Sequence, residues 1–235
     1  MTSQPRQSRP SRARPVIAID GPAGAGKSTV ARQLAQRLGF VLVDTGALYR
    51  GVALTAREAG ISWSDEAALG ALTAALKLEF VAVPGDSPRL FIAGQDRSEA
   101  IRTPDISLGA SEVSKHPAVR EALLDLQRQL GRDGGVVLEG RDIGTVVFPD
   151  AELKVFLTAA PESRAERRVS DLAERGIMAD LGQTLAEITL RDARDATRSV
   201  APLRAASDAV TLDTTHLDIP SVVEQLAELA RSKGA

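Results

Sequence analysis

The stretch VIAIDGPAGAGKST, residues 16–29, decides the fold of this chain. It opens with an apolar run typical of a buried strand, continues with the pattern G-x-x-x-x-G-K-S, and leads into an amphipathic helix. Glycines let consecutive backbone N–H groups curl around phosphate oxygens, and the helix that follows points the positive end of its dipole at the same anion. This order of strand, loop and helix predicts a phosphate-binding loop.

Different residues of the loop are expected to bind different parts of a nucleoside triphosphate and its metal ion. We expect the ammonium of Lys27 to lie between the β- and γ-phosphates and the hydroxyl of Ser28 to ligate Mg²⁺. An ordinary glycine-rich turn before a helix is the alternative. The residues expected to bind the triphosphate are Gly21, Pro22, Ala23, Gly24, Ala25, Gly26, Lys27, Ser28 and Thr29.

Length and composition place the loop in an ordinary globular chain. Its 235 residues suffice for one α/β domain with a small inserted subdomain. The net charge of -2 argues against bulk binding to nucleic acid or membrane surfaces, and no apolar run reaches the roughly 18 residues of a membrane span. The absence of cysteine excludes disulfides and fits a reducing cytoplasm. We expect a cytoplasmic monomer with small-molecule substrates and no nucleic-acid or membrane partner.

Residues 1–15 differ in composition from the rest of the chain. They hold four arginines among serines and prolines, and no acidic residue. An organelle transit peptide has this composition, but Pro5, Pro10 and Pro15 would interrupt the amphipathic helix that it needs. A secretory signal would need an apolar segment, which this stretch lacks. We therefore expect a disordered tail.

From residue 16 onward, short apolar runs alternate with helical patterns. Strands separated by helices indicate an α/β fold, a parallel sheet flanked by helices, with ligands at the carboxyl ends of the strands. The expected strands are 16–20, 41–43, 135–138, 152–158 and 209–212. The expected helices are 27–38, 47–59, 117–130, 161–174, 183–196 and 219–232.

Residues 77–98 interrupt this alternation. Residues 77–83 and 89–92 are typical of short antiparallel strands, joined through the turn-forming segment 84–88. We expect an inserted subdomain that contains β-structure and has a small core of its own.

Polar residues follow two of the expected strands, at the edge of the sheet where the loop also lies. Thr45 and Arg50 together could clamp a second anion, since arginine grips phosphate in a bidentate manner. A helix N-cap and a solvated surface charge are the alternatives. Arg141 and Asp142 lie between glycines after the strand 135–138, and catalytic residues concentrate on such loops. An ion pair that ties down the loop is the alternative.

A late helical pattern adds further charge. Arg191, Asp195 and Arg198 have spacings that share one helix face, either as part of a phosphate-facing wall or as a surface ladder of ion pairs. A second arginine-rich segment is typical of a mobile lid over a triphosphate, and it carries Arg164, Arg167, Arg168 and Arg175. For any single one of these side chains, solvation at the surface is the default.

The sequence places no histidine near these motifs and no general base beside a nucleophile. This suits an acceptor that is itself a phosphate, because a phosphate monoester, with a second pKa of about 6, is already largely dianionic at neutral pH. Phosphoryl transfer to it needs alignment, Mg²⁺ and positive charge rather than proton abstraction. The pattern favours a nucleotide kinase over a sugar kinase or a hydrolase.

Six segments together resemble the bacterial cytidylate kinases, a family of nucleoside monophosphate (NMP) kinases. They are IDGPAGAGKST (19–29), DTGALYR (44–50), IRTPDI (101–106), HPAVREAL (116–123), GRDIGTVVFPDA (140–151) and RDARDATRSVAPL (191–203). Their collinear order over nearly the whole chain after the tail is far more specific than the loop alone. The resemblance implies a P-loop NMP kinase fold that transfers phosphate from ATP, with Mg²⁺, to CMP or dCMP in pyrimidine metabolism.

The resemblance also assigns roles to single residues and segments. It implies that cytosine is read by Ser111, Arg120 and Asp142, that the acceptor phosphate is clamped by Arg50, Arg141 and Arg198 near Thr45, and that the ribose contacts Arg191 and Asp195. The expected catalytic residues are Lys27, Arg141 and Arg198. From the pattern alone, position 111 is typical of a helix surface and position 120 of the polar face of helix 117–130. Residues 16–235 then form one kinase domain, with a core over 16–45 and 110–235, an NMP-binding insert over about 46–109 and a lid over about 164–183.

This chain departs from the family pattern at Glu139, where many members carry aspartate. No aspartate at a strand end is an evident second ligand of Mg²⁺, so we expect water molecules to complete its coordination. A kinase that prefers uridylate is the alternative enzyme. A GTPase-like switch would need a guanine-reading Asn-Lys-x-Asp motif, which the chain lacks.

Overall fold

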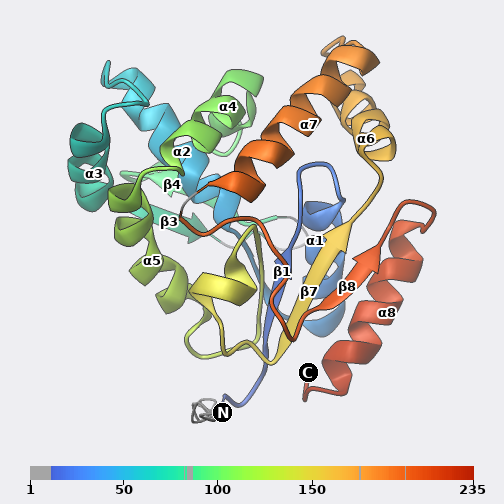
Figure 1. Cartoon of the computed structure of the whole chain (residues 1–235). Coiled ribbons are helices and arrows are strands. Elements are labelled where there is room, and N and C mark those ends of the chain that lie inside the picture. Colours follow the sequence, from blue (N-terminus) through green and yellow to red (C-terminus); the bar gives the residue numbers. More distant parts are fainter. Residues whose placement is uncertain (1–11, 82, 84–86, 175, 199) are drawn as a thin grey trace, which may run out of the picture.

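The computed structural model describes residues 12–81, 83, 87–174, 176–198 and 200–235 (Figure 1). Its central sheet has the strand order β2-β6-β1-β7-β8, and every neighbouring pair is parallel. The strands are β1 (Val16–Asp20), β2 (Val41–Asp44), β6 (Val136–Gly140), β7 (Leu153–Thr158) and β8 (Val210–Asp213). All five expected strands are confirmed, with ends shifted by at most two residues.

Helices cover both faces of this sheet because its central strands are apolar on both faces. Alternate residues such as Ile17 and Ile19 pack against α1 and α8, whereas Val16 and Ala18 pack toward the opposite face. The six expected helices are confirmed within two residues at each end. They are α1 (Lys27–Leu38), α2 (Thr45–Glu58), α5 (Pro117–Gly131), α6 (Pro161–Ala173), α7 (Leu181–Thr197) and α8 (Ile219–Arg231).

Two further helices, α3 (Glu66–Ala75) and α4 (Pro104–Val113), were not expected from the sequence. Helix α3 buries only Leu69 and Thr73. Two inward-facing positions are too few to give its sequence a clear helical repeat of apolar residues. Helix α4 spans ten residues and begins at a proline, which suits a first helical turn but also punctuates loops. Short helices of this kind are set by packing rather than by pattern.

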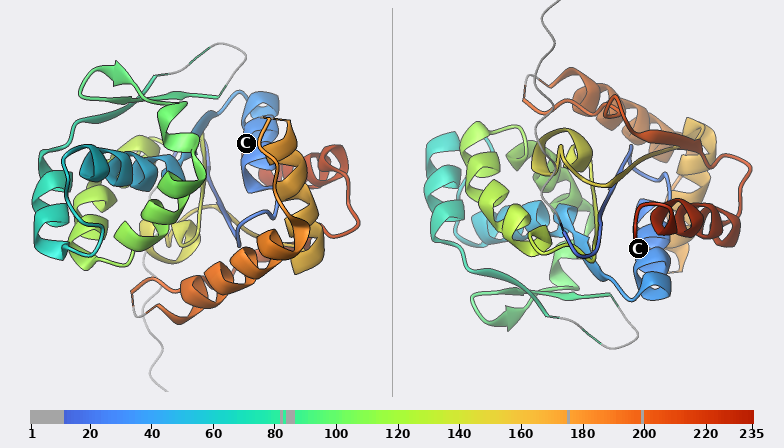
Figure 2. Two further views of the ribbon diagram at one scale, coloured as in Figure 1. Left: turned by 90° about the horizontal axis from the view of Figure 1, so that it is seen from above. Right: turned by 90° about the horizontal axis from the view of Figure 1, so that it is seen from below.

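The inserted strands are confirmed as an antiparallel pair. Strand β3 (Leu78–Val81) pairs with β4 (Arg89–Ile92), and a short β5 (Gln95–Asp96) extends this second sheet. The first three residues of the expected turn, 84–86, and residue 82 of the expected strand 77–83 lie outside the described residues. A second apolar cluster, distinct from the core that packs α1 and α8 on the main sheet, joins these strands to α2 and α5. Figure 2 shows the inserted hairpin beside these helices. The boundaries of the insert and lid remain predictions.

Residues 12–15 belong to the folded molecule, although we expected the disordered tail to include them. The side chain of Arg12 is only 7% exposed and pairs with Asp150 at 2.6 Å and Glu152 at 3.0 Å. Arg14 lies 4.3 Å over the ring of Phe40 and donates to carbonyls that end α1. A planar guanidinium can pair with two carboxylates or stack on a ring, and so it holds this segment in place. Residues 1–11 of the expected tail lie outside the described residues.

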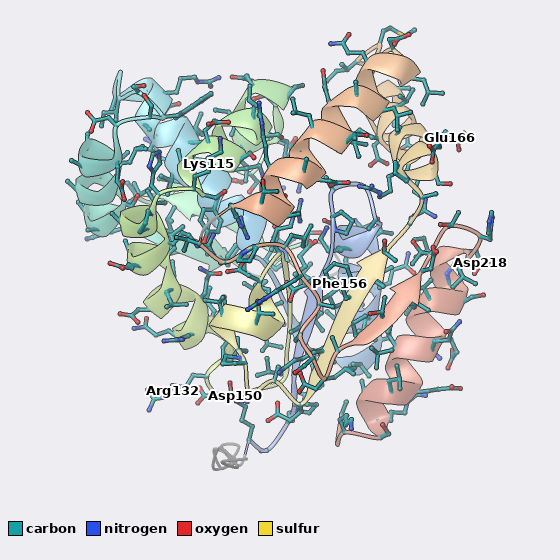
Figure 3. The ribbon with its side chains drawn as sticks, viewed as in Figure 1. Lys115, Arg132, Asp150, Phe156, Glu166 and Asp218 are labelled. Carbon is teal, nitrogen blue, oxygen red and sulfur yellow. The ribbon has the colours of Figure 1, made fainter. Side chains whose placement is uncertain are left out.

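Figure 3 shows Asp150 at the end of the molecule where the chain enters the fold. The carboxyl ends of the sheet strands face the opposite end, toward α4, α6 and α7 (Figure 1). Among the residues that the structure describes, no helix has both the length and the apolar character of a membrane span.

Candidate active site

The phosphate-binding loop joins β1 to α1 as expected. Its glycines adopt positive φ angles of 149° at Gly21, 76° at Gly24 and 83° at Gly26, which side-chain-bearing residues rarely adopt. A Cβ on Gly21 would lie 2.0 Å from the carbonyl oxygen of Leu157 in β7, so the chain passes too close there for any other residue. These angles turn the backbone into the curled form that exposes N–H groups to an anion.

Lys27 and Ser28 begin helix α1 at the end of the loop. The Lys27 side chain is buried and its ammonium donates to the carbonyl of Pro22 at 2.7 Å. Burial lowers the pKa of Lys27, and the nearby Arg141 guanidinium lowers it further. The Ser28 hydroxyl donates to Oε2 of Glu139 at 2.8 Å. The expected donor-phosphate and metal residues therefore lie side by side.

Glu139, which the sequence marks only as a departure from the family pattern, also lies beside the loop. It lies in β6 next to the loop, is 4% exposed, and its Oε1 has no hydrogen-bond partner among the described residues. Burial raises the pKa of Glu139, and the neighbouring Asp44 carboxylate raises it further. The signal in the sequence was the position at the end of a buried strand, the edge where ligands bind in such sheets.

Asp20, the last residue of β1, connects the loop to the segment after β6. Its two carboxylate oxygens accept the backbone N–H groups of Ile143 and Gly144, each at 2.8 Å. These residues open a single π-helical turn, Ile143–Val147, a form common at functional sites. Burial raises the pKa of Asp20 to about 6, although the two N–H groups favour the charged form. Asp20 therefore orients the backbone that carries Arg141 and Asp142.

Arg141 and α7 form the part of the site that faces Lys27. Nε of Arg141 donates to Oδ2 of Asp195 at 3.2 Å. Burial lowers the pKa of Arg191 to about 10, and the Arg141 guanidinium adds to this effect. Nε of Arg191 is buried and has no hydrogen-bond partner among the described residues. Lys27, which is buried, and Arg141 and Arg191, which are partly buried, thus form a cationic cluster that favours an anionic ligand.

A second group lies deeper, between α5 and the π-helical turn. Arg120 and Asp142 form a buried ion pair, and Arg120 lies 5.7 Å over the ring of Tyr49. A guanidinium nitrogen of Arg198 lies 3.9 Å from the other Asp142 oxygen. A paired carboxylate and guanidinium offer an acceptor beside a donor, the complement of a nucleobase edge.

Several expectations about side-chain placement were wrong. Ser111 and Arg120 do not lie at a surface: they are 7% and 8% exposed, because α4 and α5 turn these positions inward. Arg198 does not share a helix face with Arg191 and Asp195, because α7 ends at Thr197 and Arg198 continues in an extended conformation. Its Nε donates instead to the carbonyl of Ala201.

At the second strand, the helix cap of α2 is Asp44 and not Thr45. The Asp44 carboxylate accepts the N–H of Ala47 at 3.1 Å and pairs with Arg50 at 2.6 Å. The Thr45 hydroxyl is buried and donates to the backbone carbonyl of Glu139 at 2.7 Å. Thr45 thus links β2 to β6, and Arg50 lies where it adds to the charge around Glu139 and Arg191. The structure brings the motifs after β1, β2 and β6 together with α7.

The chain is similar to known proteins over nearly its whole length. The family model described as cytidylate kinase matches residues 17–232. The cytidylate kinase of Syntrophotalea carbinolica is 52% identical over 218 residues, covering 93% of this chain and 92% of that protein. The cytidylate kinase of Azotobacter vinelandii is 52% identical over 212 residues, covering 90% of this chain and 93% of that protein.

Among solved structures, shikimate kinase from Acinetobacter baumannii in complex with shikimate aligns over 93% of this chain and 94% of its own. The identity is 18% and the TM-score 0.45, so we draw no functional conclusion from it. The family match and the two close relatives, together with the donor loop and the arginine-rich edge of a parallel sheet, are decisive. This chain belongs to the cytidylate kinase family.

Proposed function

We propose that this chain transfers the γ-phosphoryl group of ATP to CMP or dCMP, giving ADP and CDP or dCDP. The observation that carries the proposal is the partly buried cationic cluster of Lys27, Arg141 and Arg191, whose members lie close enough to lower the pKa of Lys27 and of Arg191. Lys27 belongs to the donor loop, whereas Arg141 directly follows β6 and Arg191 belongs to α7. A phosphoryl group in transfer between two nucleotides carries the negative charge that this cluster needs.

In the proposed reaction, an oxygen of the CMP phosphate forms a bond to the γ-phosphorus as the bond to the β,γ-bridging oxygen breaks. Arg50, Arg141 and Arg198 hold the acceptor phosphate, and Lys27, Arg141 and Arg198 stabilise the charge of the transferring group. No side chain has to remove a proton, because the acceptor phosphate is already dianionic. The ion pair of Arg120 and Asp142, together with Ser111, recognises the cytosine base. Arg191 and Asp195 contact the ribose.

The residues beside the loop fit a magnesium ion. Ser28 supplies a hydroxyl and Glu139 a carboxylate with one buried oxygen that has no hydrogen-bond partner in the described part of the chain. Mg²⁺ prefers oxygen ligands and usually keeps several waters beside one or two protein ligands. Ser28 and Glu139 would hold the ion there, and it would supply positive charge to the phosphates of ATP.

We further propose that residues 46–109 and the lid around 164–183 close over the bound nucleotides. Closure would exclude water and so protect ATP from hydrolysis. We also propose a monomer that works in the cytoplasm, where a chain without cysteine meets no redox constraint.

A substrate panel tests the proposed function. ADP release would be measured in a coupled assay at fixed ATP and Mg²⁺ with CMP, dCMP, UMP, AMP and shikimate. We expect turnover with CMP and dCMP at the highest kcat/KM. Turnover with UMP or shikimate and none with CMP would overturn the proposal.

A further inference from the structure

Arg164 is a buried cation with no role in the proposed phosphate chemistry. The lid hypothesis placed it over the triphosphate, but its side chain is 5% exposed within the first turn of α6. Nε donates to the carbonyl of Ala159 at 2.9 Å, and Nη1 donates to the carbonyl of Ala23 at 3.0 Å. The same Nη1 lies 2.6 Å from Oδ2 of Asp192 in α7. One guanidinium therefore joins the end of β7, the donor loop and α7.

The contact with Ala23 orients part of the donor loop. The Ala23 carbonyl and the Gly24 N–H belong to one planar trans peptide and point in opposite directions. Because Arg164 holds the carbonyl, the Gly24 N–H points away from the Arg164 guanidinium. Gly24 also rests directly on this helix, since a Cβ there would lie 3.0 Å from Cβ of Arg164. A shift of the loop on binding a triphosphate therefore acts on Arg164.

The contact of Arg164 with Asp192 connects the donor loop to the part of α7 that lies beside the proposed CMP site. Asp192 lies next to Arg191 and one turn before Asp195, which pairs with Arg141. Helices α6 and α7 lie side by side (Figures 1 and 2). The Arg164 side chain is buried and that of Asp192 is 24% exposed. Separating them would leave a buried guanidinium without its charged partner, so Arg164 and Asp192 resist separation and move together.

We propose that Arg164 is a positioning residue that couples the donor loop to α7 through Asp192, so that bound ATP tightens the binding of CMP. This inference rests on the proposed function. By linkage, bound CMP tightens the binding of ATP by the same factor. The coupling factor is the Kd of CMP alone divided by its Kd with a saturating β,γ-imido analogue of ATP and Mg²⁺.

Calorimetric titration of the full chain measures this factor. We expect about fivefold or more in the wild type, within the usual range of coupling between two sites. In Arg164→Lys and Asp192→Asn we expect the factor to fall to within twofold of one, because lysine cannot reach three acceptors and asparagine removes the charge. The Kd of CMP alone should change less than threefold. Glu187→Gln, which alters an exposed contact with Gln183 on the same helix, should leave the factor unchanged.

A paired replacement separates coupling from simple stabilisation. Arg164→Met with Asp192→Leu puts an apolar contact where the ion pair was, which often preserves stability. We expect this double variant to fold and to lack coupling. Wild-type coupling in it, or in folded Asp192→Asn, would overturn the inference, as would a factor of one in the wild type. Failure of the wild type to phosphorylate CMP would instead overturn the proposed function.

Discussion

At the scale of single residues, substitution of Asp142 gives the clearest test of base recognition. Its carboxylate accepts only, which suits the amino group of cytosine, and it is buried against Arg120. Asp142→Asn keeps the volume but also offers an N–H₂ group, which suits the carbonyl of uracil. We expect the ratio of kcat/KM for CMP to that for UMP to fall at least tenfold, about 1.4 kcal/mol of discrimination. An equal loss with both substrates would make Asp142 a purely structural residue.

Glu139 is the residue that tests the proposed metal site. Glu139→Gln removes the charge beside Ser28, so the Mg²⁺ concentration that gives half-maximal activity should rise about tenfold, or about 1.4 kcal/mol. Glu139→Asp keeps the carboxylate and should stay within about threefold of the wild type, under roughly 1 kcal/mol. Steady-state rates at fixed ATP with titrated Mg²⁺ measure this, and chelation with EDTA should abolish turnover in all three proteins. An unchanged Mg²⁺ requirement in the glutamine variant would remove Glu139 from the metal site.

The raised pKa of Asp20 predicts that binding of CMP weakens as the pH falls through about 6. Because its pKa is raised to about 6, the ionised carboxylate that accepts both N–H groups prevails above that pH and is lost as the pH falls through it. Asp20→Asn offers one acceptor oxygen at every pH, and its KM for CMP at pH 8 should rise about tenfold, or about 1.4 kcal/mol.

We therefore expect the kcat/KM for CMP of the wild type, divided by that of Asp20→Asn, to fall toward one as the pH is lowered from 8 to 5.5. Taking this ratio cancels the titration of the CMP phosphate itself. A ratio that stays constant over this range would show that protonation of Asp20 does not affect the acceptor site.

At the scale of elements, the segment 12–15 shows how side chains outside any helix or strand can stabilise the sheet. Arg12 pairs with Asp150 and Glu152 and lies 5.4 Å over the ring of Phe148. Glu152 in turn accepts the N–H of Val16 at 2.7 Å, at the start of β1. Arg12→Met should lower the free energy of unfolding by about 2 kcal/mol, since hydrogen bonds to charged groups are lost.

Urea denaturation measures this change, and an exposed pair provides the control. Arg231 lies 3.8 Å from Glu224, and both side chains are about half exposed. Arg231→Met should change stability by less than about 0.5 kcal/mol. Similar effects of the two substitutions would mean that the segment 12–15 adds no more than a surface contact.

At the scale of the whole molecule, the site forms only where four distant parts of the chain meet. The donor loop follows β1, Arg50 lies in α2, Arg141 follows β6, and Arg191 belongs to α7. A ligand that neutralises these cations should stabilise the entire fold. CMP at 100 times its Kd should add about 2.7 kcal/mol, a rise in Tm of about 5–10 °C for a chain of this size.

Cytidine serves as the matched ligand, because it keeps the base and ribose but lacks the phosphate. At the concentration used for CMP, it should raise Tm much less in a calorimetric scan. Equal shifts with the two ligands would show that the arginines do not hold the acceptor phosphate.

Local signals determined how much of the fold could be predicted. The continuous apolar run Val136–Leu138 predicted a strand covered on both faces, and the structure buries all three residues. No comparable signal marked the π-helical turn after it, because the N–H groups of its first two residues are accepted by Asp20, more than 120 positions earlier in the chain. Likewise, the sequence alone indicates that Arg120 is an exposed polar position of its helix. It is buried because the fold brings its partner Asp142 beside it.

The sequence by itself determined the donor loop, the alternation of parallel strands with helices, and the family. These follow from the order of residue types over short stretches, where sterics and periodicity act locally. Only the tertiary structure decided the strand order β2-β6-β1-β7-β8, the burial of Arg120 and Arg164, and the pairing of Arg141 with Asp195 across 54 positions of the chain. The physical reason is that a charged side chain is buried only where the fold brings it a partner, and distant contacts leave no mark on local sequence.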